Sequence, residues 1–472
     1  MAPPQGRLGQ RQGRAGPLGR FSWAMFDWAN QPYFTLIGSF IFIPYFKDVI
    51  VGDPVRGQEI LAYTFAAGGL AVALVSPVLG AVADRTGRRK PWLAILSLVY
   101  MAAVAALWWA EPGALQGIWP IVLALITAAV AIEVATVFNN AMLPDIVEDR
   151  HLGFWSGFGF ALGYAGALAA LLGLVAAFIG PATPMIAALN LPFLAEKPLL
   201  GVEAEAYEHV RVIGPASALW YLVFVLPLFL FTPDRPSSGI RFRQAIRLGL
   251  KDLARTAAQV ARYRNVALFL VARLFYNDGL AAAYAFGAAY GATTFGWGAM
   301  ETAVFALIAL VLAGAGAVIG GWLDDRLGAK AVLFLALTCL LLGVTGAISA
   351  APGRVLFVIP VPATNPDGFL ASTSEWFYLA CGVLVGIGGG PAQAASRSMM
   401  GRISPRDQMT EFFGFYAFSG KATVFLGPLL IGVVTGLAGS DRAGVAVVAG
   451  LLLIGFLLLV PVKETRAGES VP

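Results

Sequence analysis

Long apolar segments, each of about 20 residues or more, recur along the whole chain and are separated by short polar turns. A helix of that length crosses the hydrocarbon core of a bilayer and satisfies its own backbone hydrogen bonds there. Charged residues make up only 12% of the 472 residues, whereas a soluble domain carries about 25%. We therefore predict an all-α membrane protein with twelve spanning helices. These helices are expected at residues 21–46, 58–83, 91–110, 116–140, 153–180, 215–232, 263–291, 298–323, 329–350, 374–400, 411–438 and 441–462.

A charged turn between apolar segments occurs twice. The first copy is Gly80-Ala-Val-Ala-Asp84-Arg85-Thr-Gly87-Arg88-Arg89-Lys90, and a weaker copy, Gly321-Trp-Leu-Asp-Asp325-Arg326-Leu-Gly328-Ala-Lys330, stands in the other half. Gly80 lets a neighbouring helix approach, Asp84 can neutralise the positive end of an adjacent helix, and Gly87 permits a tight reversal. A single copy could be a basic loop that only orients the helices, but two copies indicate an internal duplication. We expect a conformational gate at Gly80, Asp84, Arg85, Gly87, Arg88, Asp325, Arg326 and Gly328.

The placement of the basic residues predicts the topology. Most of the 32 lysines and arginines fall on one side of the membrane when the N-terminus is placed in the cytoplasm, which is the usual bias of cytoplasmic loops. Both termini are then cytoplasmic. We expect a disordered tail over residues 1–20, a six-helix half over 21–232, a cytoplasmic linker over 233–262, a second, pseudo-symmetric six-helix half over 263–462, and a tail over 463–472.

The linker is expected to contain a basic amphipathic helix. Phe242, Ile246, Leu250 and Leu253 share one side of it, between several arginines and a lysine. A helix of this kind lies on the membrane surface.

Polar residues inside the predicted helices are the candidates for function, because charged groups in lipid are costly unless they are paired or hydrated. Asp27, Asn30 and Gln31 share one face of the first helix. The other candidates lie on the fourth, seventh, tenth and eleventh helices. They are Glu133, Asn139, Asn140, Arg273, Asn277, Asp278, Gln393, Arg397 and Lys421.

Several of these residues also have a simple structural interpretation. Asp27 could lie at the membrane interface, Asn139 and Arg397 could reach the interface from helix ends, and Glu133 could pair with a basic residue. Lys421 is too far inside its helix for such an explanation. Arg273 and Asp278 are five residues apart, a poor spacing for an intrahelical pair, so each is expected to pair across helices.

A glycine-rich run, Gly386-Ile-Gly-Gly-Gly390-Pro391, stands in the predicted tenth helix. No strand precedes it, so it is a weak signal for phosphate binding. A flexible or closely packed point in a moving helix is the better interpretation.

The motifs together resemble those of a known family. The first charged turn resembles the signature loop of major facilitator transporters. Phe26-Asp27-Trp28-Ala29-Asn30 resembles the opening of the "unknown major facilitator" family, which includes fungal vacuolar autophagy-related amino-acid effluxers. Similar matches are Ala272-Arg273-Leu-Phe-Tyr276-Asn277-Asp278-Gly279, Asn140-Ala-Met-Leu-Pro144-Asp145, Gln393-Ala-Ala-Ser396-Arg397-Ser398 and Ser419-Gly420-Lys421-Ala422-Thr423. The second signature turn departs from the pattern, since it lacks the arginine pair.

The resemblance implies secondary transport, with helices 1, 4, 7 and 10 around a central cavity. We expect a small polar metabolite as substrate, with an amino acid as one candidate, and coupling to protons through Asp27 and Glu133. Arg273, Arg397 and Lys421 would bind a carboxylate or act as switching partners. A cation-coupled sugar symporter is one alternative, and a lipid translocator or a membrane scaffold or receptor is another.

No nucleophile and base pair, metal-ligand spacing or basic patch on a soluble domain occurs in the sequence. We therefore expect no enzyme activity, no cofactor, no metal and no nucleic-acid partner. The short loops and the lack of a long internal insertion are typical of prokaryotic members, so we expect the plasma (inner) membrane of a bacterium. We also expect a monomer.

Overall fold

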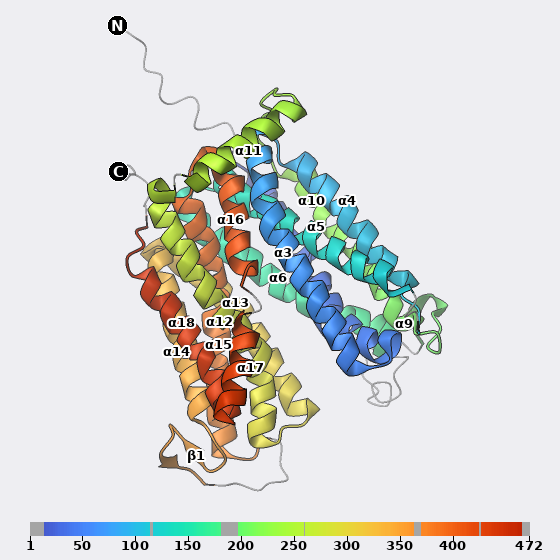
Figure 1. Ribbon diagram of the computed structural model, residues 1–472, viewed down its shortest axis with the longest axis vertical. Coiled ribbons are helices and arrows are strands. Elements are labelled where there is room, and N and C mark those ends of the chain that lie inside the picture. Colours follow the sequence, from blue (N-terminus) through green and yellow to red (C-terminus); the bar gives the residue numbers. More distant parts are fainter. Residues whose placement is uncertain are drawn as a thin grey trace. The chain divides into compact units, whose positions relative to one another are not determined.

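A computed structural model describes residues 14–113, 117–180, 197–258, 260–362, 370–423 and 426–464 (Figure 1). Most of the two predicted tails lies outside these residues. Within them, eleven helices are long and apolar enough to cross a membrane, and a bent pair, Pro17–Phe40 with Phe42–Val51, supplies a twelfth if it counts as one span. These features confirm the predicted all-α membrane fold.

The first compact unit comprises the described residues of Met1–Ile146 and Leu162–Gly249. Within it, helix α4 packs on α5 and α10, while α3 packs on α5 and α1 on α10. The bounds of its helices are α1 Pro17–Ala29, η1 Tyr33–Phe40, α2 Phe42–Tyr45, η2 Phe46–Val51, α3 Pro54–Thr86, α4 Lys90–Ala105, η3 Ala106–Trp109, α5 Ile118–Ile146, η6 Val175–Ile179, η7 Leu199–Gly201, α9 Glu208–Arg211 and α10 Ile213–Phe231.

The second compact unit comprises the described residues of Val147–Ala161 and Leu250–Pro472. Helix α15 packs on both α13 and α14, and α12 packs on α18 and α16. The bounds of its elements are η5 Asp149–His151, η8 Val260–Tyr263, α12 Arg264–Phe295, α13 Ala299–Leu327, α14 Ala329–Ser349, β1 Arg354–Val355, β2 Ile359–Pro360, α15 Thr373–Ile403, η9 Arg406–Gln408, α16 Met409–Lys421, α17 Leu426–Ala438 and α18 Asp441–Leu459.

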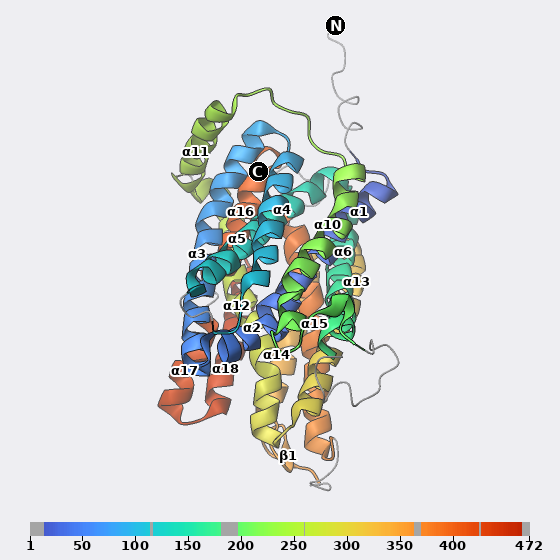
Figure 2. The same ribbon diagram turned by 90° about the vertical axis from the view of Figure 1, so that its right-hand side faces the viewer.

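Two helices run through both units. Helix α6, Leu152–Leu174, begins in the second unit and continues in the first, and α11, Phe242–Ala258, does the reverse. The hairpin of β1 and β2, which the sequence analysis did not anticipate, lies at the end of the second unit that is remote from α16 (Figure 2).

The predicted first helix is wrong in its course, because the chain does not form one straight α-helix over residues 21–46. It starts at Pro17 and, after the turn at Asn30, continues as the π-helix η1; the axis then bends by 42° between Phe40 and Phe42. Pro32 has no backbone N–H to donate to the carbonyl of Trp28. The indole Nε1 of Trp220 donates to that carbonyl instead, at 3.4 Å.

The predicted eleventh helix is also interrupted. Helix α16 ends at Lys421 and α17 begins at Leu426, and Ala422 and Thr423 form a turn after α16. The sequence predicted an uninterrupted helix here because the apolar pattern continues through the break.

The glycine-rich run of α15 is a closely packed point, one of the two interpretations that the sequence allowed. A Cβ atom on Gly390 would come 1.9 Å from the backbone oxygen of Ala313 on α13, and one on Gly386 would come 2.8 Å from that of Ala309. Real Cβ contacts of this kind are almost never below 3.0 Å. Only glycine at these positions lets the two backbones touch.

The linker helix α11 packs against α3 through its small residues. Its buried positions include Ala245, Gly249 and Thr256, and a Cβ on Gly249 would lie 2.8 Å from the backbone of Val82. Phe242 and Leu250 are 59% and 45% exposed. The small residues make the contact with α3 because they permit the closest approach, and the larger apolar residues remain outside.

Candidate functional site

The polar face of α1 lies against α6. Asp27 and Asn30 are 6% and 4% exposed, and the side-chain Nε2 of Gln31 donates to Oδ1 of Asn30 at 3.3 Å. A Cβ on Gly163 of α6 would come 3.0 Å from that Nε2 and 3.6 Å from the Cβ of Asp27. The chain therefore brings the three predicted residues of the first span together, at the end of α1 and just after it, and a glycine on α6 makes room for them.

Helix α5 carries three further candidates of the first unit. Glu133 is half-buried and interacts electrostatically with Tyr33 of η1. Asn139 is fully buried; its backbone oxygen accepts a hydrogen bond from Trp23 Nε1 at 2.7 Å, and its side-chain amide has no partner among the described residues. Asn140 is 7% exposed.

The first signature turn forms a network of charges. Arg89, which is 1% exposed, pairs with Asp84 at 3.6 Å and makes a closer ion pair with Asp145 at the end of α5. Arg235 also binds Asp145, with its Nε 2.7 Å from Oδ2. A polar cavity of about 220 Å³ adjoins these groups.

The first turn of α4 is capped from the linker. Asp234 accepts hydrogen bonds from the backbone N–H groups of Arg89 and Lys90, each at 3.0 Å. The Nζ of Lys90 donates to the carbonyl of Phe229 at 2.9 Å. Helix N-termini leave such N–H groups unpaired and favour a carboxylate there. Gly87 reverses the chain with a φ of +83°.

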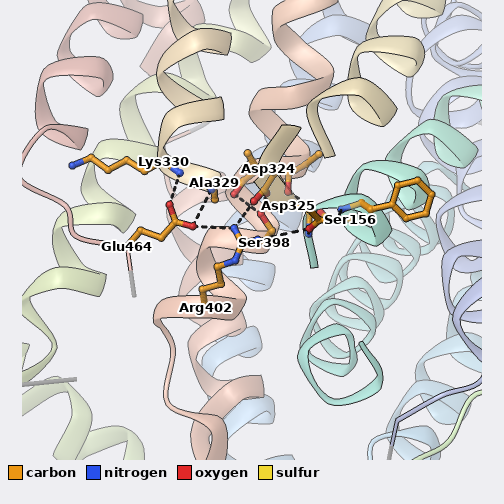
Figure 3. A network of polar contacts seen from close by, with 12 residues as sticks. Ser156, Asp324, Asp325, Ala329, Lys330, Ser398, Arg402 and Glu464 are labelled. Carbon is orange, nitrogen blue, oxygen red and sulfur yellow. Dashed lines mark hydrogen bonds and ion pairs between the residues drawn. The ribbon is translucent and has the colours of Figure 1, made fainter. Parts of the chain in front are cut away.

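The second signature turn repeats this arrangement in the second unit (Figure 3). Glu464 accepts hydrogen bonds from the N–H groups of Ala329 and Lys330 at 2.9 and 3.0 Å, and Lys330 Nζ donates to the carbonyl of Val460 at 2.8 Å. The two halves therefore cap the start of the third helix of each half in the same way, with a carboxylate that follows the last helix of that half.

Asp325 of this turn binds the start of α6. Its carboxylate accepts hydrogen bonds from the N–H groups of Gly153 and Phe154 at 2.8 and 3.1 Å. The neighbouring Asp324, which is 1% exposed, pairs with Arg402 and accepts a hydrogen bond from Ser398, both on α15. Arg402 also lies 3.0 Å from Glu464. Arg326 is exposed and lies over the ring of Trp322.

The charges of the two networks are reversed. In the first unit the cation, Arg89, lies in the turn and the anion, Asp145, at the end of α5. In the second unit the anion, Asp324, lies in the turn and the cation, Arg402, near the end of α15. The second turn, whose sequence matches the signature less well, therefore also forms an ion pair, but the acidic and the basic residue have exchanged places.

Arg397 holds the start of α6 against α15. Its Nε donates to Ser156 Oγ at 2.9 Å, and its guanidinium lies 4.2 Å from the ring centre of Phe160. Ser156 Oγ in turn donates to the carbonyl of Ala394 at 2.7 Å. Arg397 is 1% exposed, so it is buried within protein and does not reach out of its helix end.

Arg273 pairs across helices, as the sequence predicted. Its Nη1 donates to the carbonyl of Tyr416 at 2.7 Å and to Ser419 Oγ at 2.9 Å on α16, and its Cζ lies 3.5 Å from the ring centre of Tyr416. A Cβ on Gly420 would come 2.7 Å from Nη1. Within the described part of the chain, Nε of Arg273 has no hydrogen-bond partner.

The remaining candidates of the second unit vary in their burial. Asp278 is 2% exposed and lies near the middle of α12, whereas Asn277, Gln393 and Lys421 are half-buried. Asp278 interacts electrostatically with Thr423, in the turn after α16, and with Arg273 of its own helix.

Asp234, Glu464, Arg402 and Ser398 are polar residues of these networks that the sequence analysis did not single out. Asp234 and Glu464 each follow the last apolar segment of a half within a few residues. An alignment of the two halves at their ends, rather than at the signature turns alone, would have revealed this pair.

Solved structures with a similar arrangement of helices identify the fold. The fucose:proton symporter FucP of E. coli superposes with a TM-score of 0.69, over 95% of this chain and 98% of that chain, at 14% identity. The proton:xylose symporter XylE gives 0.65, over 95% of each chain, at 13% identity. The fold is that of a major facilitator transporter, and the protein is a multi-pass integral membrane protein.

The sequence relatives define the family. The model of the family described as "Vacuole effluxer Atg22 like" matches residues 49–153 and 155–471, so the chain belongs to this family. The uncharacterized MFS-type transporter YxiO of Bacillus subtilis is 26% identical over 95% of each chain. Autophagy-related protein 22-1 of Neosartorya fischeri is 24% identical over a matched region that covers 54% of this chain and 43% of the fungal protein. YxiO and the two symporters are transporters by name, which agrees with the predicted class of protein and not with an enzyme.

Proposed function

We propose that this transporter moves a small polar metabolite with a carboxylate group, in the first place an amino acid, across the plasma membrane of a bacterium. Transport would proceed by alternating access, in a monomer, with coupling to protons. Membership of an effluxer-like family supports the class of activity.

The observation that carries the choice of substrate is Arg273. A guanidinium has five N–H donors in a planar fork that matches a carboxylate. Arg273 lies well inside α12, its hydrogen bonds to Tyr416 and Ser419 use only Nη1, and Nε has no hydrogen-bond partner within the described residues. Such unused donors on a fixed cation fit an anionic group of a substrate.

The other polar residues have complementary roles in this proposal. Asp27 and Glu133 would carry the coupled protons, since acidic residues within spanning helices are candidates for proton relays. Arg397 and Lys421 would act as switching partners. The substrate would be oriented by the side-chain amides of Asn30, Gln31, Asn139, Asn140, Asn277 and Gln393.

The two signature turns would act as gates. The hydrogen bonds of Asp325 to the start of α6, together with those of Arg397 to Ser156, would form in one state of the cycle and break in the other. Asp84 would have the equivalent role in the first turn. Gly80, Gly87 and Gly328 would shape these turns, and Arg85, Arg88 and Arg326 would keep them on the cytoplasmic side.

The test is transport by purified protein in liposomes. A mixture of radiolabelled amino acids should be exchanged across the membrane, and an imposed proton gradient should drive accumulation. We expect Arg273→Gln to reduce amino-acid exchange by at least about tenfold, because one lost charge-assisted interaction costs about 1.5–3 kcal/mol. Sugars, nucleosides and short peptides serve as competing substrates.

Arg354→Gln is the matched control, since Arg354 is exposed in the β-hairpin. This variant should exchange amino acids at the wild-type rate. If folded Arg273→Gln protein also kept the wild-type rate, Arg273 would not bind the substrate. Exchange of sugars alone would favour the symporter alternative.

A further inference from the structure

The hairpin of β1 and β2 presents an apolar tip. Leu356, Phe357 and Val358, which connect the two strands, are 50%, 55% and 78% exposed, and Ile359 at the start of β2 is 47% exposed. The run from Leu356 to Pro360 contains no polar side chain. A contiguous exposed run of large apolar side chains marks a contact with a membrane or with another molecule.

The backbone of the tip is held in an unfavourable conformation. Leu356 and Phe357 have φ angles of +50° and +67°, in the left-handed region that residues with a Cβ rarely adopt. Such strained residues persist where the surroundings require them. Both side chains remain outside the fold, so packing among the described residues does not compensate for the strain, whereas a contact beyond the protein would.

The tip is fixed at one end of a membrane span (Figure 1). The backbone N–H of Phe357 donates to the carbonyl of Ser349, the last residue of α14, at 3.1 Å. Helix α14 begins in the second signature turn and has 21 residues, so it is about 30 Å long. The hydrocarbon core of a bilayer is also about 30 Å thick. The backbone of the tip therefore lies at the boundary between hydrocarbon and headgroups, on the face of the membrane opposite to that turn.

The tip also lies on the lipid-facing side of α14. Exposed residues of this helix, including Leu335, Leu342 and Thr345, recur at helical spacing and form one stripe. Ser349, four residues beyond Thr345, continues the stripe, yet it is only 2% exposed. Since the carbonyl of Ser349 accepts the hydrogen bond from Phe357, the hairpin reaches the end of the stripe that faces lipid.

We propose that the tip, residues 356–359, is buried in the interface of the leaflet opposite the second signature turn and anchors the end of α14 there. Lipid is the partner that fits, because the tip continues the lipid-facing surface of a span, carries no charge and lies at the depth of the interface. Apolar side chains gain free energy when they enter the boundary between headgroups and acyl chains. This anchor does not depend on the substrate or on the proposed transport cycle.

The test is the fluorescence of a label on the tip in a bilayer. The full-length Val358→Cys variant is labelled with the environment-sensitive fluorophore NBD and reconstituted into nanodiscs of phosphatidylcholine and phosphatidylglycerol. Labelled wild type gives the background from Cys339 and Cys381. Two quenchers are compared, iodide in the water and a nitroxide on the upper acyl chain of added lipid.

The lipid nitroxide should quench the Val358→Cys label strongly. Interfacial segments lie about 5–10 Å into the boundary between headgroups and acyl chains, so the iodide quenching constant should be at least about threefold lower than for a label in water.

Asp441→Cys is the matched control. Asp441 is exposed at the start of α18, and the neighbouring Arg442 donates to the carbonyl of Ala350, directly after α14, at 3.2 Å. Both labelled positions therefore lie at the same end of the second unit. The label on Asp441→Cys should be quenched strongly by iodide and weakly by the lipid nitroxide.

Two results would overturn the proposal. Equal iodide quenching of the Val358→Cys and Asp441→Cys labels would place the tip in water. A Val358→Cys label that is shielded from iodide but not quenched by the lipid nitroxide would show that protein, such as a second copy of this chain, covers the tip. If Val358→Cys does not fold, Leu356→Cys on the same tip decides by the same criteria. A failure to transport amino acids would leave these results intact.

Discussion

Replacing Arg402 by methionine should lower the free energy of unfolding by about 3–5 kcal/mol, because it leaves buried charge without its partner. Arg402 forms ion pairs with Asp324, Asp325 and Glu464, and its side chain is only 8% exposed. The measurement is the thermal unfolding of the purified protein, whose midpoint should fall by more than about 5 °C.

Arg406→Met is the matched control for this prediction. Arg406 also forms an ion pair, with Asp149, but both side chains are nearly half exposed. Exposed pairs contribute about 0–1 kcal/mol, so its loss should change the midpoint little. The double variant Arg402→Met with Asp324→Asn should recover part of the loss, because it removes the stranded charge. If Arg402→Met matched Arg406→Met, the network would not be a buried electrostatic unit.

Replacing Gly157 by alanine should release the start of α6 from α13. A Cβ at this position would come 2.1 Å from the backbone oxygen of Ala317 and 3.0 Å from the Cα of Gly321. Because backbone cannot move aside as a side chain can, α6 must shift, and overpacking of this kind costs about 1–3 kcal/mol. Hydrogen exchange of the amides of residues 153–160 should become faster by about 10-fold to 100-fold.

The same helix contains the control for this substitution. A Cβ on Gly173 would meet nothing within 4 Å, so Gly173→Ala should leave exchange at residues 153–160 unchanged. Faster exchange in both variants would point to a general loss of stability. Unchanged exchange in Gly157→Ala would show that the close approach to α13 is not required.

The sequence predicted most helix ends because the signals for them are local. Gly328 separates two apolar segments, and Ala329 starts the next helix as expected; Asp441 likewise begins α18 at the predicted residue. The bend of the first span was missed although Pro32 is a local signal, since the apolar pattern on both sides of it is uninterrupted. Hydrophobic periodicity indicates which residues are buried. It does not indicate which backbone groups form hydrogen bonds with each other.

The candidate site was predicted as a set of residue types rather than as a set of contacts. Arg273 and Asp278 were correctly placed inside one helix, but only the structure shows that the first turns to α16 and that the second interacts with Thr423 in the turn after α16. Arg402 and Glu464 escaped notice because each is an ordinary charged residue at the end of an apolar segment. Their roles depend on contacts with residues that are far away in the sequence.

Segment 147–161 has a consequence for how the gene could be divided. A cut in the linker before Phe242 would produce two polypeptides, and the first would carry the residues that Asp325 and Arg397 of the second bind. The second polypeptide alone would be missing a structural part of its own compact unit. Fragments expressed separately should therefore accumulate poorly, and co-expression should restore both, as in a complementing split protein.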